Sequence, residues 1–325
     1  MNNQPASTIQ TAPSPAAGPR QLAWNRFKRN RPAIFSAWYL LALLILIVSW
    51  PVLLNVLGPA FAQWHDPNRL SDAQFMPPDA HHWFGTDLHG RDLFSRVLYG
   101  AQISLLVGVV GALVSLVIGV LWGAIAGYLG GRTDAVMMRI VDILYSLPTI
   151  IFVLVLLTTL GDAIRHASII QRYAILKDHA SIILVFVGLG AVSWLTMARI
   201  VRGQVLSLRT RPFVEASRAL GAKPHWIIAR HIIPNTLGVV ITYLTLTVPA
   251  IILYESFLSF LGLGVQPPMA SWGTLMAEGV WQINPIRIYW WLVIFPGAVM
   301  VTTLLALNFL GEGLRDAWDV KRGQS

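Results

Sequence analysis

Six long apolar stretches constrain this chain more than any other feature of its sequence. Each has at least 18 residues and contains no Asp, Glu, Lys, Arg or His. A helix of roughly 20 apolar residues crosses the ~30 Å hydrocarbon core of a bilayer. A buried helix of a soluble protein would explain any one stretch, but six in one chain are typical of a membrane bundle. The stretches are 34–57, 102–128, 143–160, 181–198, 236–254 and 288–310.

The composition agrees with this interpretation, because 55% of the residues are hydrophobic and only 12% are charged. A soluble domain would need more charge to cover its surface. We therefore predict an all-α, polytopic membrane protein with six transmembrane helices. The predicted parts are a partly disordered N-terminal tail (1–33), a first transmembrane helix (34–57), an extracytoplasmic segment (58–101), a five-helix core (102–310) that includes a cytoplasmic loop (203–235), and a C-terminal tail (311–325).

The Lys and Arg residues predict the orientation. The loops on one side of the predicted membrane hold 17 of them and the alternate loops hold seven. Cytoplasmic loops are the basic ones in membrane proteins, so both termini are expected in the cytoplasm. The net charge of +9 therefore indicates orientation and contact with membrane lipid, and we expect no nucleic-acid partner.

Glycine and proline inside the stretches indicate how the helices pack. Small residues at helical spacing allow close contact with a neighbouring helix, and prolines kink or break a helix. Such breaks occur where a bundle lines a path, and equally as simple packing irregularities. The glycines are Gly108, Gly111, Gly119, Gly123 and Gly127, and the prolines are Pro148, Pro249 and Pro296.

The long basic loop 209–235 has the signals of two short helices that meet at Gly221. Pro212 and Pro224 can each begin a helix, Gly221 can terminate the first one, and Pro234 is expected to end the second. A rigid knob of this kind can dock into a groove of a partner protein. The alternative is an amphipathic helix on anionic lipid. Docking would use Phe213, Val214 and Leu220 as anchors, whereas lipid binding would use Arg209, Arg211, Arg218 and Lys223.

The same loop resembles a known family motif. Glu215-Ala216-Ser217 is followed by Gly221 and then by Ile233-Pro234. This resembles the EAA loop of ABC importer permeases, although Ser217 replaces an Ala and His231 and Ile233 also depart from the pattern. Further stretches resemble the dipeptide/oligopeptide/nickel branch, and within it the oligopeptide permease C subunit. They are GTDLHGRDLFSR from Gly85, GYLGGRTDAVMMRIVDI from Gly127, WLTMARIVRGQVLSL from Trp194, ESFLSFLGLGVQPP from Glu255 and GEGLRDAWD from Gly311.

The resemblance implies a permease subunit in the type I ABC importer architecture, in the bacterial cytoplasmic (inner) membrane. It implies three kinds of partner: a second homologous permease subunit, two ATP-binding subunits, and an extracytoplasmic peptide-binding protein. The chain itself has no G-x-x-x-x-G-K-[ST] phosphate loop, so we expect no enzymatic activity and no cofactor, with ATP and Mg on the partner subunits. The residues implied to couple to the ATPase are Phe213, Glu215, Ala216, Ser217, Leu220 and Gly221.

Two further groups of residues have more than one interpretation. Asp87, Arg91 and Asp92 are predicted to form an ion-paired turn before the second stretch. The histidines in the same loop make a metal site an alternative interpretation, but their spacing fits no compact metal-binding motif. Glu255 directly follows the stretch 236–254, and it is expected to face a partner or an aqueous path, or else the outer headgroups.

The cargo and the class of protein can each be interpreted in more than one way. Nickel, glutathione or a peptide antibiotic are cargoes of the same family type. An ion-coupled secondary transporter would need ionisable groups within the stretches, and none is present; a membrane scaffold is a further possibility. The insertion at 161–180 is interpreted as an external amphipathic helix or as a loop without a function.

Overall fold

The computed structural model describes residues 19–165, 180–266 and 269–318, and within these ranges it is helical without any β-strand. One isolated bridge joins Thr86 to Asp92. The helices are α1 (Pro19–Arg29), α2 (Arg31–Val56), α3 (Pro59–His65), α4 (Leu93–Leu129), α5 (Gly131–Tyr145), α6 (Thr149–Arg165), α9 (Ala180–Leu208), α10 (Pro212–Ala219), α11 (Pro224–Ile227), the π-helix η1 (Ile228–Ile232), α12 (Ile233–Phe260), α13 (Trp272–Trp281) and α14 (Trp291–Trp318).

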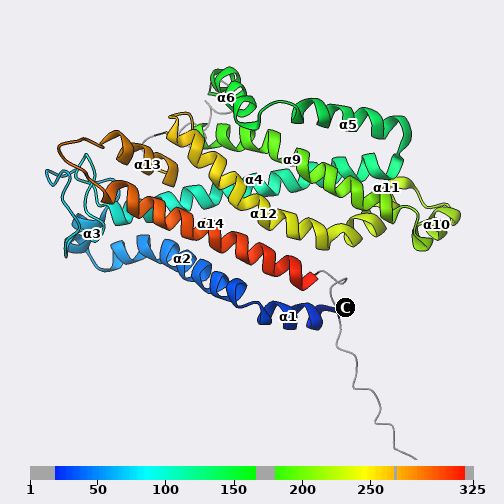
Figure 1. The fold of residues 1–325 in the computed structure, drawn as a ribbon, viewed down its shortest axis with the longest axis horizontal. Coiled ribbons are helices and arrows are strands. Elements are labelled where there is room, and N and C mark those ends of the chain that lie inside the picture. Colours follow the sequence, from blue (N-terminus) through cyan, green and yellow to red (C-terminus); the bar gives the residue numbers. More distant parts are fainter. Residues whose placement is uncertain (1–18, 166–179, 267–268, 319–325) are drawn as a thin grey trace, which may run out of the picture.

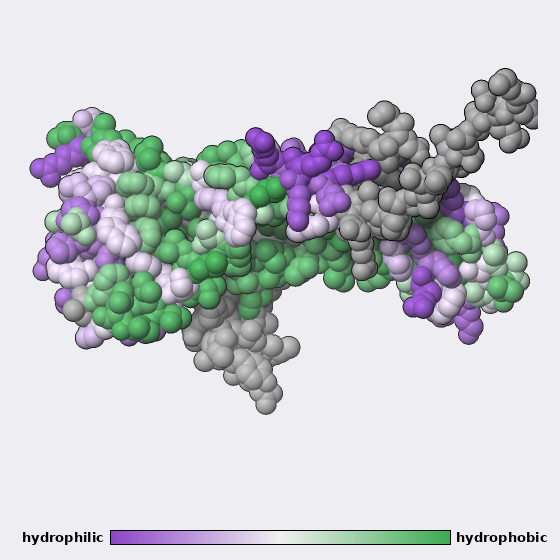
Figure 2. Space-filling view, turned by 90° about the horizontal axis from the view of Figure 1, so that it is seen from below, coloured by the Kyte–Doolittle hydropathy of each residue, from purple (hydrophilic) through white to green (hydrophobic). Residues whose placement is uncertain are grey.

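The long helices run along the long axis of an elongated bundle (Figure 1). At one end lies α10, and this end is called the α10 end below. At the other lie α3, α13 and the loop between α3 and α4, and this is the α13 end. Figure 2 shows that much of the visible face between the two ends is hydrophobic and that hydrophilic residues gather at both ends, with one further hydrophilic patch near the middle, beside the residues drawn in grey. This distribution suits a molecule whose middle lies in lipid.

The predicted count of six spans is not confirmed. Among the described residues, four helical segments are long and apolar enough to cross a membrane: Arg31–Val56, Leu93–Leu129, Pro224–Phe260 and Trp291–Ala317. Helices α5 and α6 would form a fifth span if the bent pair counts as one. The predicted stretch 181–198 lies inside α9, which is not one of these segments.

The stretch predicted at 143–160 does not form one helix, because the chain turns between α5 and α6 by 89°, and the predicted kink or break at Pro148 is confirmed. The break coincides with Pro148, which disfavours helical conformation in the preceding residue and offers no backbone N–H. Pro249 and Pro296, by contrast, interrupt neither α12 nor α14. Neighbouring helices can satisfy the freed carbonyl groups in such cases.

The glycine stripe of α4 makes the predicted close contacts. A Cβ atom on Gly123 would lie 2.4 Å from the carbonyl oxygen of Ala198 in α9. On another part of α4, a Cβ atom on Gly108 would lie 2.6 Å from the side chain of Ile252 in α12. Helix α4 is therefore held between α9 and α12, and side chains at these positions would force the helices apart.

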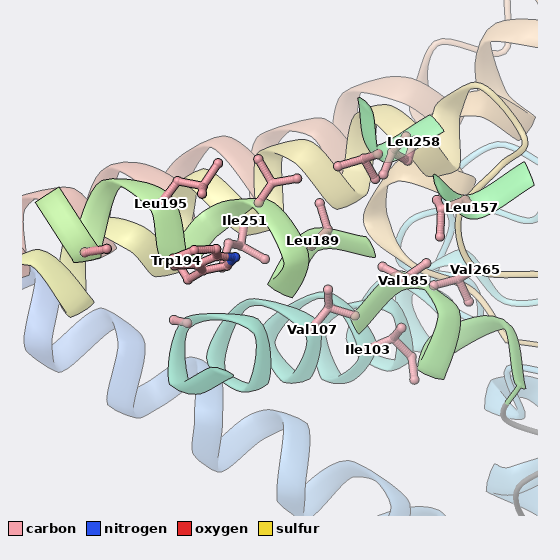
Figure 3. Close-up of a cluster of buried hydrophobic side chains, with 14 of the residues drawn as sticks. Ile103, Val107, Leu157, Val185, Leu189, Trp194, Leu195, Ile251, Leu258 and Val265 are labelled. Carbon is pink, nitrogen blue, oxygen red and sulfur yellow. The ribbon is translucent and has the colours of Figure 1, made fainter. Parts of the chain in front are cut away.

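A buried cluster joins the four helices α4, α6, α9 and α12 (Figure 3). Most of its members are aliphatic residues of these helices, joined by Trp194 of α9, Val141 of α5, and Val265 and Met269 of the chain that follows α12. Without water to drive association, such interdigitated packing supplies much of the stability of a membrane bundle. The labelled members are Ile103, Val107, Leu157, Val185, Leu189, Trp194, Leu195, Ile251, Leu258 and Val265.

Three predictions concern the ends and the insertion. The predicted tail 1–33 contains α1, which packs against α14, and α14 itself continues past residue 310 to Trp318. The predicted disorder of residues 1–18 lies outside the described residues. The same is true of most of the insertion at 161–180, since residues 166–179 are not described.

Candidate functional site

Helix α10 begins and ends as its sequence predicts. Pro212 occupies its first turn, where the missing N–H costs nothing. Gly221 has a left-handed backbone with φ of +81°. The N–H of Ala222 donates to the carbonyl of Ser217 at 3.1 Å, and the N–H of Gly221 donates to that of Arg218 at 3.0 Å. These two bonds form a Schellman motif, so the predicted termination at Gly221 is confirmed.

Val214 fixes α10 to the rest of the molecule. It has no exposed surface and belongs to a buried cluster with Tyr128 of α4, Val205 of α9 and Ile227 of α11. The prediction that Val214 is an anchor for a partner is therefore wrong, because its side chain is buried against other helices of this chain and is not accessible to a partner. Its role is to hold the two short helices α10 and α11, together called the knob below, rigidly against the bundle. A packed cluster of this kind has little freedom to rearrange.

The other residues predicted for coupling lie on the surface of the knob. Leu220 is 88% exposed and Phe213 is 39% exposed, while Glu215 and Ala216 are also exposed and Ser217 is half-buried. Leu220 and Phe213 thus place two exposed apolar side chains on the same small element. The structure therefore leaves an apolar tip beside a carboxylate, free of contacts that would hide it.

Sequence reasoning missed Trp226 and named His231 only as a departure from the motif. Trp226 is 49% exposed and its ring lies 5.1 Å from that of His231, which also lies 6.2 Å from the ring of Phe213. His231, in η1, thus contacts both α10 and α11 through its ring. The sequence signal for Trp226 was an aromatic residue two positions after Pro224, in the first turn of the predicted second helix.

The expectation that Pro234 ends the second helix is wrong. The chain continues from α11 through η1 into α12 without a break, and Pro234 lies in the first turn of α12. The π-turn immediately before it explains the difference. A wider turn accommodates a residue that lacks an N–H and whose ring would collide with the carbonyl four residues earlier. As a result, the loop is connected directly to a long transmembrane helix.

Basic residues of the knob contact α4 as well as solvent. The guanidinium of Arg218 lies 5.6 Å from the ring centroid of Tyr128, and Arg209 donates to the carbonyl of Gly127 at 3.3 Å. Arg211 and Lys223 are exposed. Two of the four cations proposed for lipid binding are therefore in contact with the end of α4.

At the α13 end, Asp87 organises an ion-pair cluster. Its carboxylate accepts hydrogen bonds from Arg91 Nε at 2.7 Å and from Arg96 Nη1 at 2.6 Å. Arg96 is 4% exposed and also binds Glu278 of α13, with distances of 2.5 and 3.1 Å. Sequence reasoning named Asp87 and Arg91 but missed Arg96 and Glu278, because the second carboxylate comes from a helix more than 180 residues away.

Asp92 caps the beginning of α4. Its Oδ2 atom accepts the N–H of Ser95 at 2.9 Å, which satisfies one of the free N–H groups of the first turn. His82 and His65 are buried beside it, with Nδ1 atoms 3.0 and 3.4 Å from its carboxylate. In the same loop, the N–H of His82, and secondarily that of His81, hold the pKa of Asp79 below its usual value.

No group of three or more His, Cys, Asp or Glu side chains with metal-binding geometry occurs in the described ranges. The His and Asp residues of this loop instead serve the cap and the turns. The site residues therefore fall into two sets at opposite ends of the molecule, the exposed knob at the α10 end and the ion-pair cluster at the α13 end (Figure 1).

Glu255 is placed differently from the prediction. It has no exposed surface, and its carboxyl accepts hydrogen bonds from Ser259 at 2.6 Å and Ser104 at 3.1 Å. The expectation that it faces a partner, an aqueous path or headgroups is therefore wrong for this chain. The compensating hydroxyl groups come from two helices, and their convergence could not be seen along the sequence.

Comparisons with known proteins agree on the kind of molecule. A model of the binding-protein-dependent transport system inner membrane component matches residues 119–322, and one of the N-terminal TM domain of oligopeptide transport permease C matches residues 18–78. Similar curated proteins include oligopeptide transport system permease protein OppC of Haemophilus influenzae, with 45% identity over 93% of this chain and 88% of that protein. The OppC of Escherichia coli K12 has 46% identity over 93% and 91%.

A third relative, dipeptide transport system permease protein DppC of Bacillus subtilis, has 41% identity over 99% of this chain and 92% of that protein. Among solved structures, the MetNI methionine ABC transporter in an inward-facing conformation is similar in fold. Its TM-score is 0.50 with 19% identity, over 66% of this chain and 91% of the other. With 204 of its residues matched to one family model and relatives above 40% identity over most of its length, the chain belongs to the family of inner membrane components of binding-protein-dependent transport systems.

Proposed function

We propose that this chain is the permease subunit of an ATP-driven peptide importer, in which the knob formed by α10 and α11 docks onto ATP-hydrolysing subunits. The observation that carries the proposal is the exposed apolar tip of Phe213 and Leu220 beside Glu215, on a knob that Val214 fixes to the bundle. Apolar anchors with a charged rim are typical of a helix that fits a groove. The continuous helix from α11 to α12 would carry motion of the knob into the membrane.

The other partners follow from this role. A second homologous permease subunit would complete the translocation path, two subunits would bind ATP and Mg, and an extracytoplasmic peptide-binding protein would deliver cargo. The chain itself would be neither an enzyme nor the holder of a cofactor, which agrees with the absence of a phosphate loop from its sequence. Contact with membrane lipid completes the set, and no nucleic acid takes part.

The proposed orientation puts the α10 end and both chain termini in the cytoplasm of a bacterium, with the protein in its inner membrane. Most Lys and Arg residues lie in the segments on that side, including the loop 209–235. The cluster of Asp87, Arg96 and Glu278 would then face the outside, where the peptide-binding protein arrives. The chain contains no Cys, so single cysteines at Gln74 and Ala219, neither of them buried, test this directly. An impermeant reagent added outside should label Gln74→Cys and spare Ala219→Cys; the opposite pattern would refute the orientation.

Oligopeptides or dipeptides are the proposed cargo, since the relatives above 40% identity carry these names. The test uses the chain co-expressed with the ATP-binding subunits and permease partner of the same gene cluster and reconstituted into vesicles. ATP-dependent uptake of a labelled peptide, dependent on the binding protein, is the expected result. Uptake of nickel, glutathione or a peptide antibiotic in place of the peptide would refute the proposed cargo but would leave the proposed class, an ATP-driven importer, unchanged. Uptake driven by an ion gradient without ATP would refute the proposal, as would the absence of any transport, which the membrane scaffold predicts.

A further inference from the structure

The end of α12 near α13 carries a carboxyl group that the proposed function does not use. Glu255 has no exposed surface, and within the described ranges no Lys, Arg or His forms an ion pair with it. Burying such a group is costly unless hydrogen bonds replace its hydration. The bonds come from Ser259 at 2.6 Å, Ser104 at 3.1 Å and, more weakly, Ser256 at 3.5 Å. Because burial of a carboxyl group lowers stability, we expect Glu255 to have a structural role that offsets this cost.

The serine hydroxyls connect the carboxyl to the chain that follows α12. The Oγ atom of Ser104 accepts the N–H of Trp272 at 3.2 Å, so its own hydrogen remains for Glu255. In the same way, the Oγ atom of Ser259 accepts the N–H of Val265 at 3.2 Å and donates to Glu255. Trp272 is the first residue of α13, where N–H groups have no partner within the helix. The carboxyl thus lies one hydroxyl away from the beginning of α13.

The beginning of α13 is seated tightly between α4 and α12. Trp272 is completely buried, and its indole N–H donates to the carbonyl of Val97 in α4 at 3.2 Å. A Cβ atom on Gly273 would lie 2.3 Å from the carbonyl oxygen of Ser256 in α12. There is no space for α13 to shift along either helix without breaking these contacts. The position of α13 is therefore specified by α4 and α12 together.

Helix α13 forms one wall of a cavity of about 460 Å³ at this end of the molecule. Its opposite wall is the end of α12 and the turn that follows, and Arg96 and Asp87 lie at its edge. Glu278 of α13 closes that edge by binding Arg96. The cavity has the size of a small-ligand site, and its width depends on where α13 sits. The lining includes Ser259, Gly262, Val265, Thr274, Leu275 and Ala277.

We propose that Glu255 is a positioning residue that ties α13 to α12 and α4, so that movement of α12 changes the cavity at the α13 end. Helix α12 is continuous with α11, and the 37 residues from Pro224 to Phe260 form a rod of roughly 55 Å at 1.5 Å per residue. One end of this rod leaves the knob, and the other end carries the carboxyl that holds α13. The inference rests on the proposed function in one respect, namely that ATP-hydrolysing subunits move the knob.

The test follows a single cysteine in the cavity wall, which the absence of native Cys permits. Ala277→Cys is introduced into the assembled transporter in lipid nanodiscs, and its reaction rate with a maleimide is measured without nucleotide and with ATP trapped. If Glu255 ties α13 to α12, the maleimide reaction rate without nucleotide should differ from the rate with ATP trapped. With Glu255→Ala, the nucleotide-free rate should rise about tenfold, the change expected for the loss of about one buried hydrogen bond, and the two rates should converge. Peptide uptake should fall while ATP hydrolysis continues.

Conservative and matched variants separate positioning from general packing. Glu255→Gln keeps the shape and one acceptor oxygen, so it should restore most of the difference between the two rates. Ser104→Ala should behave as a weaker form of Glu255→Ala. Ser115→Ala is the control, because Ser115 is a completely buried serine of the same helix as Ser104, and its hydroxyl has no hydrogen-bond partner among the described residues; it should match the unmodified protein. Each variant is first shown to insert and to elute as one species in detergent.

Two results would overturn the inference. One is Glu255→Ala with unchanged labelling rates and unchanged uptake, and the other is an equal effect of Ser115→Ala and Ser104→Ala. Failure of the proposed function looks different. A transporter that imports no peptide, but in which Glu255→Ala still raises the labelling rate at position 277, would refute peptide import and keep the role of Glu255.

Discussion

Replacement of Gly221 should disconnect the knob from its partner without unfolding the bundle. The residue has φ of +81°, and a Cβ atom added there would meet no atom within 4 Å. The entire cost is therefore that of the left-handed backbone, roughly 1–2 kcal/mol for a residue with a Cβ atom. At 1.4 kcal/mol per factor of ten, the native turn becomes about five- to thirtyfold less favoured. Loss of the turn breaks both hydrogen bonds of the Schellman motif and releases Leu220 from its place.

The assay compares ATP-binding subunits co-purified with each variant, together with peptide uptake. Gly221→Val should lower both most strongly, because β-branching further restricts the backbone. Gly221→Ala should be intermediate and Gly221→Asn mildest, since Asn tolerates the left-handed region. Expression and membrane insertion should remain normal for all three.

Gly262 supplies a matched control, because it also has a positive φ, of +78°, and nothing within 4 Å of an added Cβ atom. It follows α12 at the α13 end and is held by the same pair of hydrogen bonds, from Gly262 to Ser259 and from Leu263 to Leu258. Gly262→Val should therefore carry the same backbone cost and leave ATPase co-purification intact. Full co-purification with Gly221→Val, or an equal loss with Gly262→Val, would refute the reasoning.

Three more predictions follow from the structure. Glu215→Lys should reduce ATPase co-purification and uptake if the knob docks on protein, whereas a helix lying on anionic lipid would tolerate the added positive charge; normal values for this variant would favour lipid. Arg96→Gln should lower the stability of the solubilised protein by about 1.5–3 kcal/mol, because it removes the buried hydrogen bonds of Arg96 to two carboxylates and leaves Asp87 and Glu278 with Arg91 alone, while Arg199→Gln, which breaks the exposed pair with Asp142, should cost about 0–1 kcal/mol; thermal unfolding in detergent measures both, and equal losses would contradict the cluster. Gly123→Ala should also lower the thermal midpoint, because its Cβ atom would lie 2.4 Å from the carbonyl of Ala198, and an unchanged midpoint would show that α4 and α9 can separate freely.

Much of the fold could be predicted from local signals. The apolar stretches at 34–57, 102–128 and 236–254 lie within α2, α4 and the helix that includes α12, apart from one residue beyond the end of α2, since a run of uncharged residues in lipid has no alternative to a helix. Gly221 was identified as a terminator because a left-handed residue after a helix is nearly a local requirement. The stripe of glycines in α4 predicted close packing for the same reason, although it could not say which helices approach.

The partners of individual side chains depended on the tertiary structure. Local signals around Pro234 predicted a helix end, yet a π-turn and the surrounding bundle keep the helix continuous. Val214 appeared to be available to a partner until α4, α9 and α11 enclosed it.

For the remaining site residues, too, the sequence determined only the local part. It determined the apolar segments, the turn at Gly221 and the charge asymmetry between the two sides, because each depends on neighbours along the chain. Only the tertiary structure decided that Arg96 binds Glu278 and that Glu255 is held by serines of α4 and α12. The physical reason is that an ion pair or a buried carboxyl is stabilised by groups within about 3 Å, and helices that are distant in sequence supply those groups only after they have packed.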